Sequence, residues 1–327
     1  MKKKYKFPFP DIPDMPEEII NAIDSGKLLL FIGAGISKLI GYPLWFELGK
    51  RLVNKAVEEK ILSNSEKEVL LSSGFTPMQI VTIISKRFDS AGKRGIEYIV
   101  EELSNNKDIN LSIAKQIAKY LSAYNATIVT TNADETLENT KPLNDRKVIK
   151  SFVDYDDENN RDYSFIHLHG SISEPENMVF TSEDYAKAYS VERIFGIKLK
   201  KLMDYKWTIL FVGYGVSEFE LIRYFLNDDD SKDRRLFMLD GYLYKDLIKY
   251  EFDKEYFKSL GIYLLPYSRE KDNYNALINV LKKWDKIVET KTFASTSRKV
   301  SIINKIVSNM PTDENVQIIE KLVNNNE

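Results

Sequence analysis

The sequence predicts an α/β protein built on a mostly parallel, Rossmann-like sheet with helices on both faces. Short apolar runs rich in β-branched residues alternate with helical segments along the chain, which is the rhythm of a parallel sheet. Two of these runs stop at a Gly-x-Gly turn, and others stop at polar residues. Because open α/β sheets bind ligands at the carboxyl ends of their strands, these endings also predict where a site lies.

Composition limits the kinds of function. The chain has 327 residues, 43% of them hydrophobic, with 47 Lys and Arg against 49 Asp and Glu, a balance that does not indicate nucleic-acid binding. It contains no Cys and two His, so disulfides, thiol nucleophiles and cysteine-ligated zinc are excluded, and we expect no metal. No run approaches the roughly twenty apolar residues of a membrane span, and no secretory signal is visible. We therefore expect a soluble, cytoplasmic protein.

Three parts are predicted along the chain. Residues 1–26 form a Pro-rich arm and a first helix, and residues 27–290 form a ligand-binding domain. A helical insertion over about 48–122 interrupts this domain, because its apolar residues recur at helical spacing without a strand pattern. Residues 291–327 contain two amphipathic segments, which would cap the domain, contact another chain or lead into a further domain.

The first strand and its turn, LLLFIGAGIS at 28–37, are typical of phosphate binding. Gly33 and Gly35 lack a Cβ, so the backbone turns sharply and a ligand can approach closely, while the N–H groups of the following helix favour negative charge. A dinucleotide pyrophosphate would suit this turn. The third glycine of the dinucleotide pattern is replaced by Lys38, and the stretch alone is equally compatible with a turn that binds nothing.

The second strand, 126–130, runs directly into the polar sequence Thr131-Asn132-Ala133-Asp134. Asn132 has two interpretations. It is either an amide that orients a water or a ribose hydroxyl, or the N-cap of a following helix, since Asn is a favoured cap.

Both His residues belong to the third strand, 163–168, and its end. Alternate side chains of a strand share a face, so we expect His167 and His169 to point the same way, with His169 exposed at the strand end. An imidazole there would serve as a general base, whereas a structural role is favoured for His167.

Three further strands complete the predicted sheet. The strand at 207–212 ends at a second Gly-x-Gly and leads into a helix from about Ser217. The strand at 235–239 ends at Asp240, and a last strand, 262–266, is followed by a closing helix.

Four endings together resemble the sirtuin-like NAD-binding domain, over about residues 20–290. They are GAGIS after the first strand, Thr-x-Asn-x-Asp after the second, His-Gly after the third and Gly-x-Gly after the fourth. The chain is most similar to the divergent bacterial branch of anti-phage defence proteins, in which the domain hydrolyses NAD to deplete infected cells. The resemblance implies that NAD is the substrate, that His169 is the base, and that Asn132 and Asp134 face the nicotinamide-side ribose. It places the pyrophosphate and neighbouring ribose at Gly33, Ala34, Gly35 and Ser37, and the adenosine half at Gly213, Gly215, Ser217 and Asp240.

Two departures bear on the substrate. Sirtuin deacylases carry a four-cysteine zinc module, which a chain without Cys lacks, and their Asp-Phe-Arg run is replaced by Leu44-Trp45-Phe46. Trp45 and Phe46 would shield the nicotinamide from solvent or serve as core aromatics. NAD with water as the second substrate is the simpler assignment.

The sequence therefore predicts an NAD+ glycohydrolase without zinc, acting in antiviral defence and abortive infection through NAD depletion. Asn132 would position the ribose hydroxyls and water, and His169 would take the proton. The resemblance also suggests a homo-oligomer such as a tetramer, controlled by a phage trigger or a partner subunit. The alternatives are a non-catalytic sensor of NAD or ADP-ribose and an NAD-dependent protein deacylase.

Overall fold

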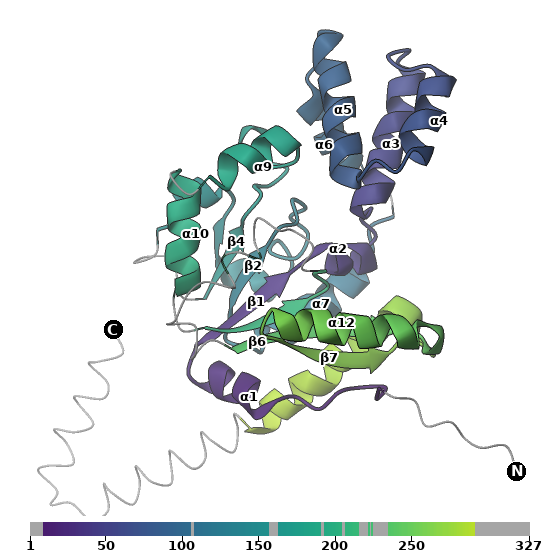
Figure 1. The fold of residues 1–327 in the computed structure, drawn as a ribbon. Helices are drawn as coiled ribbons and strands as arrows, with labels where there is room; N and C mark the ends of the chain where they lie inside the picture. Colours follow the sequence, from purple (N-terminus) through teal and green to yellow (C-terminus); the bar gives the residue numbers. More distant parts are fainter. Residues whose placement is uncertain are drawn as a thin grey trace, which may run out of the picture.

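A computed structural model describes residues 9–105, 108–156, 163–190, 193–204, 207–215, 222, 224 and 235–291. Its centre is one sheet of seven parallel strands (Figure 1). The strands are β1 (Leu28–Ile32), β2 (Thr127–Thr130), β3 (Lys147–Ile149), β4 (Ser164–His167), β5 (Thr208–Val212), β6 (Arg235–Tyr242) and β7 (Ile262–Ser268). Their order across the sheet is β3-β4-β2-β1-β5-β6-β7. The predicted α/β fold with a parallel, Rossmann-like sheet is confirmed.

The strand order places a switch point beside β1. From β1 the chain moves to β2, β3 and β4 on one side, and then returns to β5 on the other side. Leu29 pairs with Thr127 in β2 and with Ile209 in β5. Connections therefore leave in opposite directions at this point, which opens a crevice at the carboxyl ends of the strands.

Helices cover both faces of the sheet. Leu28, Leu30 and Ile32 of β1 belong to one buried cluster, while Leu29 and Phe31 belong to another. A strand buried on both faces reads as a continuous apolar run, which explains the sequence LLLFI. The first face is covered by α1 (Glu17–Asp24), α2 (Ala34–Ile40), α7 (Leu111–Ser122) and a helix over 276–291, and the second by α9 (Ser182–Ala188), α10 (Ile194–Asp204) and α12 (Leu247–Ser259).

Between β1 and β2 the described chain is helical, as the sequence predicted for this stretch. It contains α3 (Trp45–Glu58), α4 (Asn64–Ser72), α5 (Pro77–Ser90) and α6 (Gly95–Ser104), which stand away from the sheet as a group (Figure 1). Capping boxes begin α4 at Ser63 and α5 at Thr76. Short 3-10 turns occur at Leu143–Asp145, Phe152–Asp154, Pro175–Asn177, Tyr244–Asp246 and Asn273–Asn275.

Several elements differ from the sequence prediction. The edge strand β3 was missed because it has three residues and begins with an exposed Lys147. Helix α12 was missed because Ile248 and Phe252 are exposed, so its apolar residues do not mark a buried face. Strand β6 continues to Tyr242, so Asp240 lies inside the strand and not after it. Most of the helix expected from Ser217, and the tail after residue 291, lie outside the described residues.

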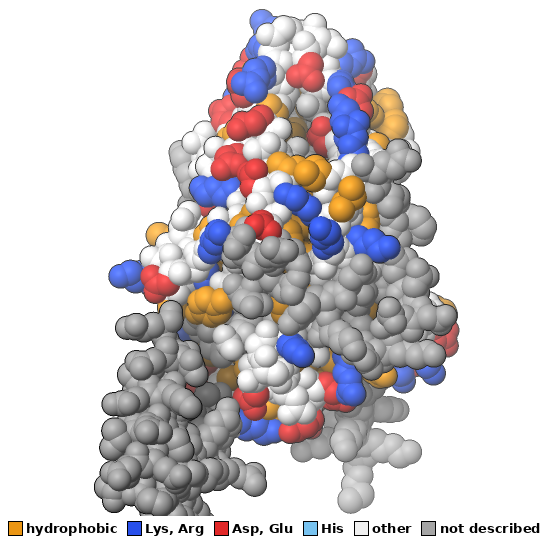
Figure 2. All heavy atoms as spheres, turned by 90° about the vertical axis from the view of Figure 1, so that its left-hand side faces the viewer, with side chains coloured by type: hydrophobic (Ala, Val, Ile, Leu, Met, Phe, Trp, Pro, Cys, Tyr) orange, Lys and Arg blue, Asp and Glu red, His pale blue; other side chains and the backbone are white. Residues whose placement is uncertain are grey.

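The surface carries both signs of charge. Figure 2 shows Lys and Arg next to Asp and Glu over the upper half of the face that carries α9 and α10, with single hydrophobic side chains between them. Ile194 and Ile197 of α10 are two exposed apolar residues. Within the described part of the chain, every helix is too short or too polar to cross a bilayer.

Candidate functional site

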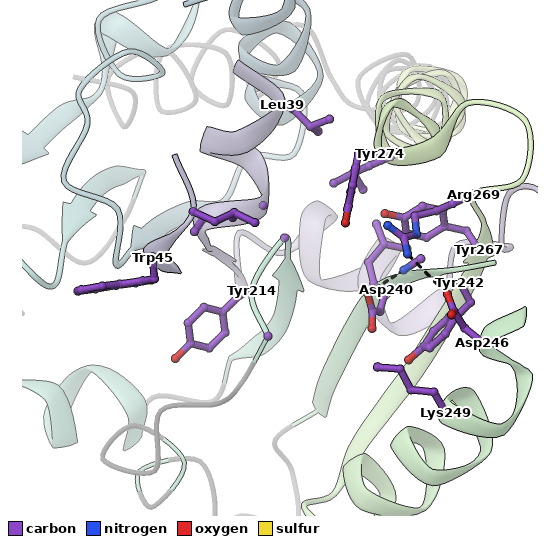
Figure 3. Close-up of a pocket in the computed structure, with 18 of the residues that line it drawn as sticks. Leu39, Trp45, Tyr214, Asp240, Tyr242, Asp246, Lys249, Tyr267, Arg269 and Tyr274 are labelled. Carbon is purple, nitrogen blue, oxygen red and sulfur yellow. Dashed lines mark hydrogen bonds and ion pairs between the residues drawn. The ribbon is translucent and has the colours of Figure 1, made fainter. Parts of the chain in front are cut away.

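A cleft of about 550 Å³ lies at the carboxyl ends of β1, β5 and β6 (Figure 3). One wall carries Trp45, Leu39 and Tyr214, and the opposite wall carries polar side chains from β6, β7 and the start of α12. The cleft sits at the switch point, where this class of sheet binds ligands. Among the predicted site residues, Ala34, Gly35, Gly213, Gly215 and Asp240 line it.

The two glycine turns pack against each other at the floor of the cleft. A Cβ at Gly33 would lie 2.5 Å from the Tyr214 Cα, and one at Gly35 would lie 2.9 Å from the Gly213 Cα. Gly213 has φ +63°, a left-handed conformation that favours glycine. The Gly35 N–H donates to the Gly213 carbonyl at 2.8 Å. Close backbone packing between β1 and β5 is therefore a requirement for Gly33 and Gly35, independent of any ligand.

A smaller hollow of about 40 Å³ lies next to the cleft, on the β2 side of β1. Because both are lined by Ala34, Trp45 and Thr131, they are adjacent, and together they extend across the switch point. The small hollow is also lined by the predicted site residues Ser37, Asn132 and Asp134.

Asp134 is a buried carboxyl at this end of the site, only 7% exposed. Ser37 Oγ donates to its Oδ2 at 2.5 Å. Burial raises the pKa of Asp134 to about 6; the nearby Glu138 adds to the rise, and the Ser37 hydrogen bond opposes it. A carboxyl with this pKa exchanges a proton near neutral pH.

Asn132 is anchored from both strands. Its Nδ2 donates to the Gly33 carbonyl at 3.0 Å, and its backbone N–H donates to Thr130 Oγ1 at 3.0 Å. Thr130 Oγ1 in turn donates to the Ile32 carbonyl at 3.0 Å. The expected helix after Asn132 is absent, because residues 131–135 are irregular and residues 136–139 form a turn, so Asn132 is not the N-cap of a helix.

His167 is fully buried and bonded through both ring nitrogens. Nδ1 lies 2.8 Å from the Asn132 carbonyl, and Nε2 lies 2.7 Å from Glu138 Oε1. Burial lowers the pKa of His167, but the hydrogen bond and the charge of Glu138 outweigh it and raise the pKa overall. Glu138 is a site residue that the sequence analysis missed; its position near Asn132 in the chain was the available signal.

His169 is not exposed, and this expectation was wrong. It is also fully buried, with Nε2 2.6 Å from the hydroxyl of Tyr189, the residue that follows α9, and Nδ1 3.3 Å from the hydroxyl of Tyr185 in α9. Burial lowers the pKa of His169 to about 3. It lines neither the cleft nor the small hollow.

The two histidines also do not share a face. β4 ends at His167, so strand alternation stops there, and the chain turns at Gly170, which has φ +76°. His167 lies 5.4 Å from the ring of Phe165, in the first buried cluster, whereas His169 contacts tyrosines of the second cluster. The two imidazoles therefore belong to opposite faces of the sheet.

Trp45 and Phe46, the two aromatic residues shortly after Pro43, lie in different surroundings. Trp45 lines both hollows and lies 5.0 Å from the ring of Phe180, while Phe46 is 49% exposed and lines neither. Trp45 therefore fits the shielding role, and Phe46 does not. The remaining predicted site residue, Ser217, lies outside the described residues.

The far end of the cleft holds residues that the sequence analysis did not find. The guanidinium of Arg269 lies 4.5 Å from the ring of Tyr274 and 3.7 Å from the carboxylate of Asp246. Its Nε is buried without a hydrogen-bond partner among the described residues. Asp240 lies on the same wall, with its pKa raised by burial (Figure 3). Arg269 and Tyr274 follow the last strand, and no motif announces them.

Metal ligands do not gather at the site. Within the ranges that the structure describes, no three His, Asp or Glu side chains form a group that would hold a metal ion.

Comparison with known proteins indicates the family of this domain. Residues 126–258, which include Asn132, His167, His169 and Asp240, match the family described as "SIR2-like domain". The chain contains a divergent SIR2-like domain. It is also 27% identical over 210 residues to "Defense-associated sirtuin 2" of Bacillus subtilis, an alignment that covers 63% of this chain and 19% of that protein. The aligned part of this chain thus spans about a fifth of the length of this relative. A SIR2-like domain implies that NAD takes part in the function of this chain.

Proposed function

We propose that this SIR2-like domain is an NAD+ glycohydrolase, which cleaves NAD with water into nicotinamide and ADP-ribose. The observation that carries the proposal is the elongated site across the switch point. A roomy cleft lies on one side of β1, and a small polar hollow with Asn132 and Asp134 lies on the other. NAD is an elongated ligand whose two nucleotide halves are joined by a pyrophosphate, so a site that extends to both sides of the glycine turn suits it.

The ends of the site fit different halves of NAD. The cleft of about 550 Å³ offers Tyr274 and Arg269 for stacking and Asp240 for ribose hydroxyls, which suits the adenosine half. The small hollow offers Asn132, Asp134 and the Trp45 ring, which suits the nicotinamide ribose. The pyrophosphate would then pass Ala34 and Gly35, which line the cleft between them.

The reaction breaks the bond between C1′ of the ribose and the ring nitrogen of nicotinamide. The nitrogen keeps the electron pair, the sugar carbon gains oxocarbenium character, and the oxygen of water forms the new bond to C1′. Asn132 would orient the ribose hydroxyls and the water, and His169 would accept the proton that water loses. For this step His169 Nε2 must leave the Tyr189 hydroxyl, so the described state is a resting state of the proposed enzyme.

The biological role follows from the relative and from the product. The similarity to a protein named for its association with defence supports a role of this chain in anti-phage defence by depletion of NAD. Constant hydrolysis would kill the host cell, so a homo-oligomer under the control of a phage component or a partner subunit belongs to the proposal.

The test is nicotinamide release from NAD by the purified protein over a range of concentrations, beside His169→Ala and Asn132→Ala. We expect both variants to lose release and to keep the fold, as judged by circular dichroism. Lys86→Ala is the matched control, because Lys86 is exposed on α5, in an ion pair with Glu183 of α9. Release that persists in both site variants would contradict the assignment.

A second candidate is favoured by the burial of His169. A module that binds NAD or ADP-ribose without cleaving it needs the cleft but no accessible base. Such a sensor would bind NAD in a calorimeter at saturating levels and release no nicotinamide, whereas the hydrolase would consume the ligand. An NAD-dependent deacylase, in contrast, would release nicotinamide only when an acyl-lysine peptide is added.

A further inference from the structure

His167, at the end of β4, forms a buried bridge between Glu138 and the loop that carries Asn132. The Asn132 carbonyl can only accept a hydrogen bond, so His167 Nδ1, at 2.8 Å, must carry a proton. His167 Nε2 faces the Glu138 carboxyl at 2.7 Å, which holds the ring on its other side. Whether the proton between them resides on nitrogen or on oxygen, the bond from Nδ1–H to Asn132 persists.

With this bridge, three polar groups of Asn132 are held by hydrogen bonds. The side-chain amide of Asn132 bonds to Gly33, its N–H bonds to Thr130, and its carbonyl bonds to His167. Each bond comes from a different strand end, namely β1, β2 and β4. The orientation of the Asn132 peptide and of its amide is thus determined by three strands at once. A catalytic group held in this way is preorganised.

Stability alone gives little reason for this arrangement. His167 is 0% exposed and Glu138 is 2% exposed, and a well-packed apolar pair is often as stable as a buried ion pair. Glu138 Oε2 also lacks a hydrogen-bond partner within the described part of the chain. A function in holding Asn132 accounts for the retention of a charged pair under the small hollow.

We propose that His167 is a positioning residue, whose Nδ1–H fixes the Asn132 carbonyl and so aims the Asn132 amide at the nicotinamide-side ribose. Glu138 has the supporting role of holding the ring. The inference rests on the proposed NAD hydrolysis and deepens it, because it explains how the reactive end of the site is kept in register with the glycine turn.

Two isosteric substitutions separate the two bonds of His167. In His167→Asn the side-chain NH₂ occupies the place of Nδ1 and still donates to Asn132, but Glu138 loses its partner. In His167→Gln the NH₂ occupies the place of Nε2 and still donates to Glu138, but the Asn132 carbonyl loses its donor. The positioning role predicts that His167→Asn is the less stable protein and the faster enzyme.

The expected result is a split between kcat and stability. His167→Gln should lower kcat by roughly tenfold to a hundredfold relative to His167→Asn, with KM for NAD within about threefold, since a misplaced group costs turnover more than binding. A merely structural role predicts the opposite order, with kcat following the melting temperature. Equal kcat in the two variants would also overturn the inference.

Hydrogen–deuterium exchange gives a reading that does not need turnover. We expect faster exchange over residues 130–134 in His167→Gln than in His167→Asn, and the reverse would contradict the inference. The two possible failures are distinguishable. No nicotinamide release by the wild type contradicts the hydrolase while the exchange still tests the bridge, whereas an active wild type with the wrong order of variants contradicts the positioning role alone.

Discussion

The surroundings of His167 and of His169 offer a comparison within one short stretch of chain. His167 lies between a carboxyl and a carbonyl, two acceptors that favour a protonated ring. His169 lies between two tyrosine hydroxyls on the opposite face of the sheet, without a carboxylate bonded to either nitrogen in the described contacts. The pKa is raised in the first region and lowered in the second, although both rings are equally buried.

The difference shows that burial alone does not decide the charge of a histidine. Desolvation acts against the imidazolium in both regions, and only the partner of His167 outweighs it. A ring paired with a carboxyl is suited to hold a structure together, whereas His169 must leave the buried surroundings that lower its pKa before it can accept a proton at the substrate. Substitutions and changes of pH should therefore affect the two regions differently, most strongly at Glu138.

Removal of the Glu138 carboxyl should lower the free energy of unfolding more than any other change considered. Glu138→Ala leaves the buried His167 without its partner, and loss of one member of a buried pair costs about 3–5 kcal/mol. Chemical denaturation at pH 7 measures this difference. Glu138→Gln is the control, because its amide can still donate to a neutral His167 ring, and we expect a clearly smaller loss. Equal losses in both variants would contradict this expectation, because they would mean that a neutral hydrogen bond to His167 contributes nothing without the charge of Glu138.

The pH dependence of stability should carry opposite signs for the two rings. Burial lowers the pKa of His169 to about 3, so below the unfolded value near 6.5 only the unfolded chain takes up this proton, and stability falls by up to about 1.4 kcal/mol per pH unit. The raised pKa of His167 instead contributes stability below about 6.5, which is lost as the pH rises through its folded value.

Denaturation of the wild type and of His169→Gln between pH 4.5 and 7.5 measures the first of these effects. We expect the variant to lose less stability than the wild type as the pH falls. Parallel curves would mean that His169 titrates in the folded protein as it does in the unfolded chain.

The hydroxyls of Tyr185 and Tyr189 should contribute less to stability than the Glu138 carboxyl. Tyr189→Phe removes a hydrogen bond of 2.6 Å to a buried nitrogen, and we expect a loss of about 1–2 kcal/mol. Tyr185→Phe removes the longer contact of 3.3 Å and should cost about 0.5–1 kcal/mol. Because these changes weaken the resting state of His169, nicotinamide release by the double variant should increase relative to the wild type. A decrease would show that the hydroxyls take part in the reaction.

The smallest effect is expected at the outer edge of α9. Lys86 and Glu183 form an exposed ion pair of 2.8 Å between α5 and α9, which solvent screens. Lys86→Ala should leave the melting temperature and the pH profile unchanged within error. A measurable shift in either quantity would mean that the packing of α9 against α5 affects His169 from a distance.

The fold was largely predictable from the sequence because its signals are local. Apolar runs and glycine turns mark β1 and β5, and helical spacing marks α3 and α5. Elements without such signals were missed, among them β3, with three residues at the sheet edge, and α12, with its exposed apolar side chains.

The site was predictable only in part, because its chemistry depends on pairings across the sheet. The polar stretch after β2 correctly indicated that Asn132 and Asp134 meet in one hollow. The opposite surroundings of His167 and His169 result from where β4 ends and from the position of α9, which no spacing of residues encodes. The pair of Arg269 and Tyr274 was missed for the same reason, since both follow a strand in a loop without a recognisable motif.

The parallel sheet has a consequence for the synthesis of the protein. Leu28 at the start of β1 pairs with Thr208 in β5, and the cleft is lined by residues from Ala34 to Leu277. Contacts between such distant residues form late and slowly, because the intervening chain must first be ordered. A ribosome that has completed β1 and β2 has made residues of only one wall of the cleft, among them Leu39 and Trp45, and not the wall from β6, β7 and α12. A chain cut short before β5 contains the residues of the small hollow but lacks Gly213, Tyr214 and the polar wall of the cleft, so an activity that needs the whole site can begin only after nearly the whole described chain has folded.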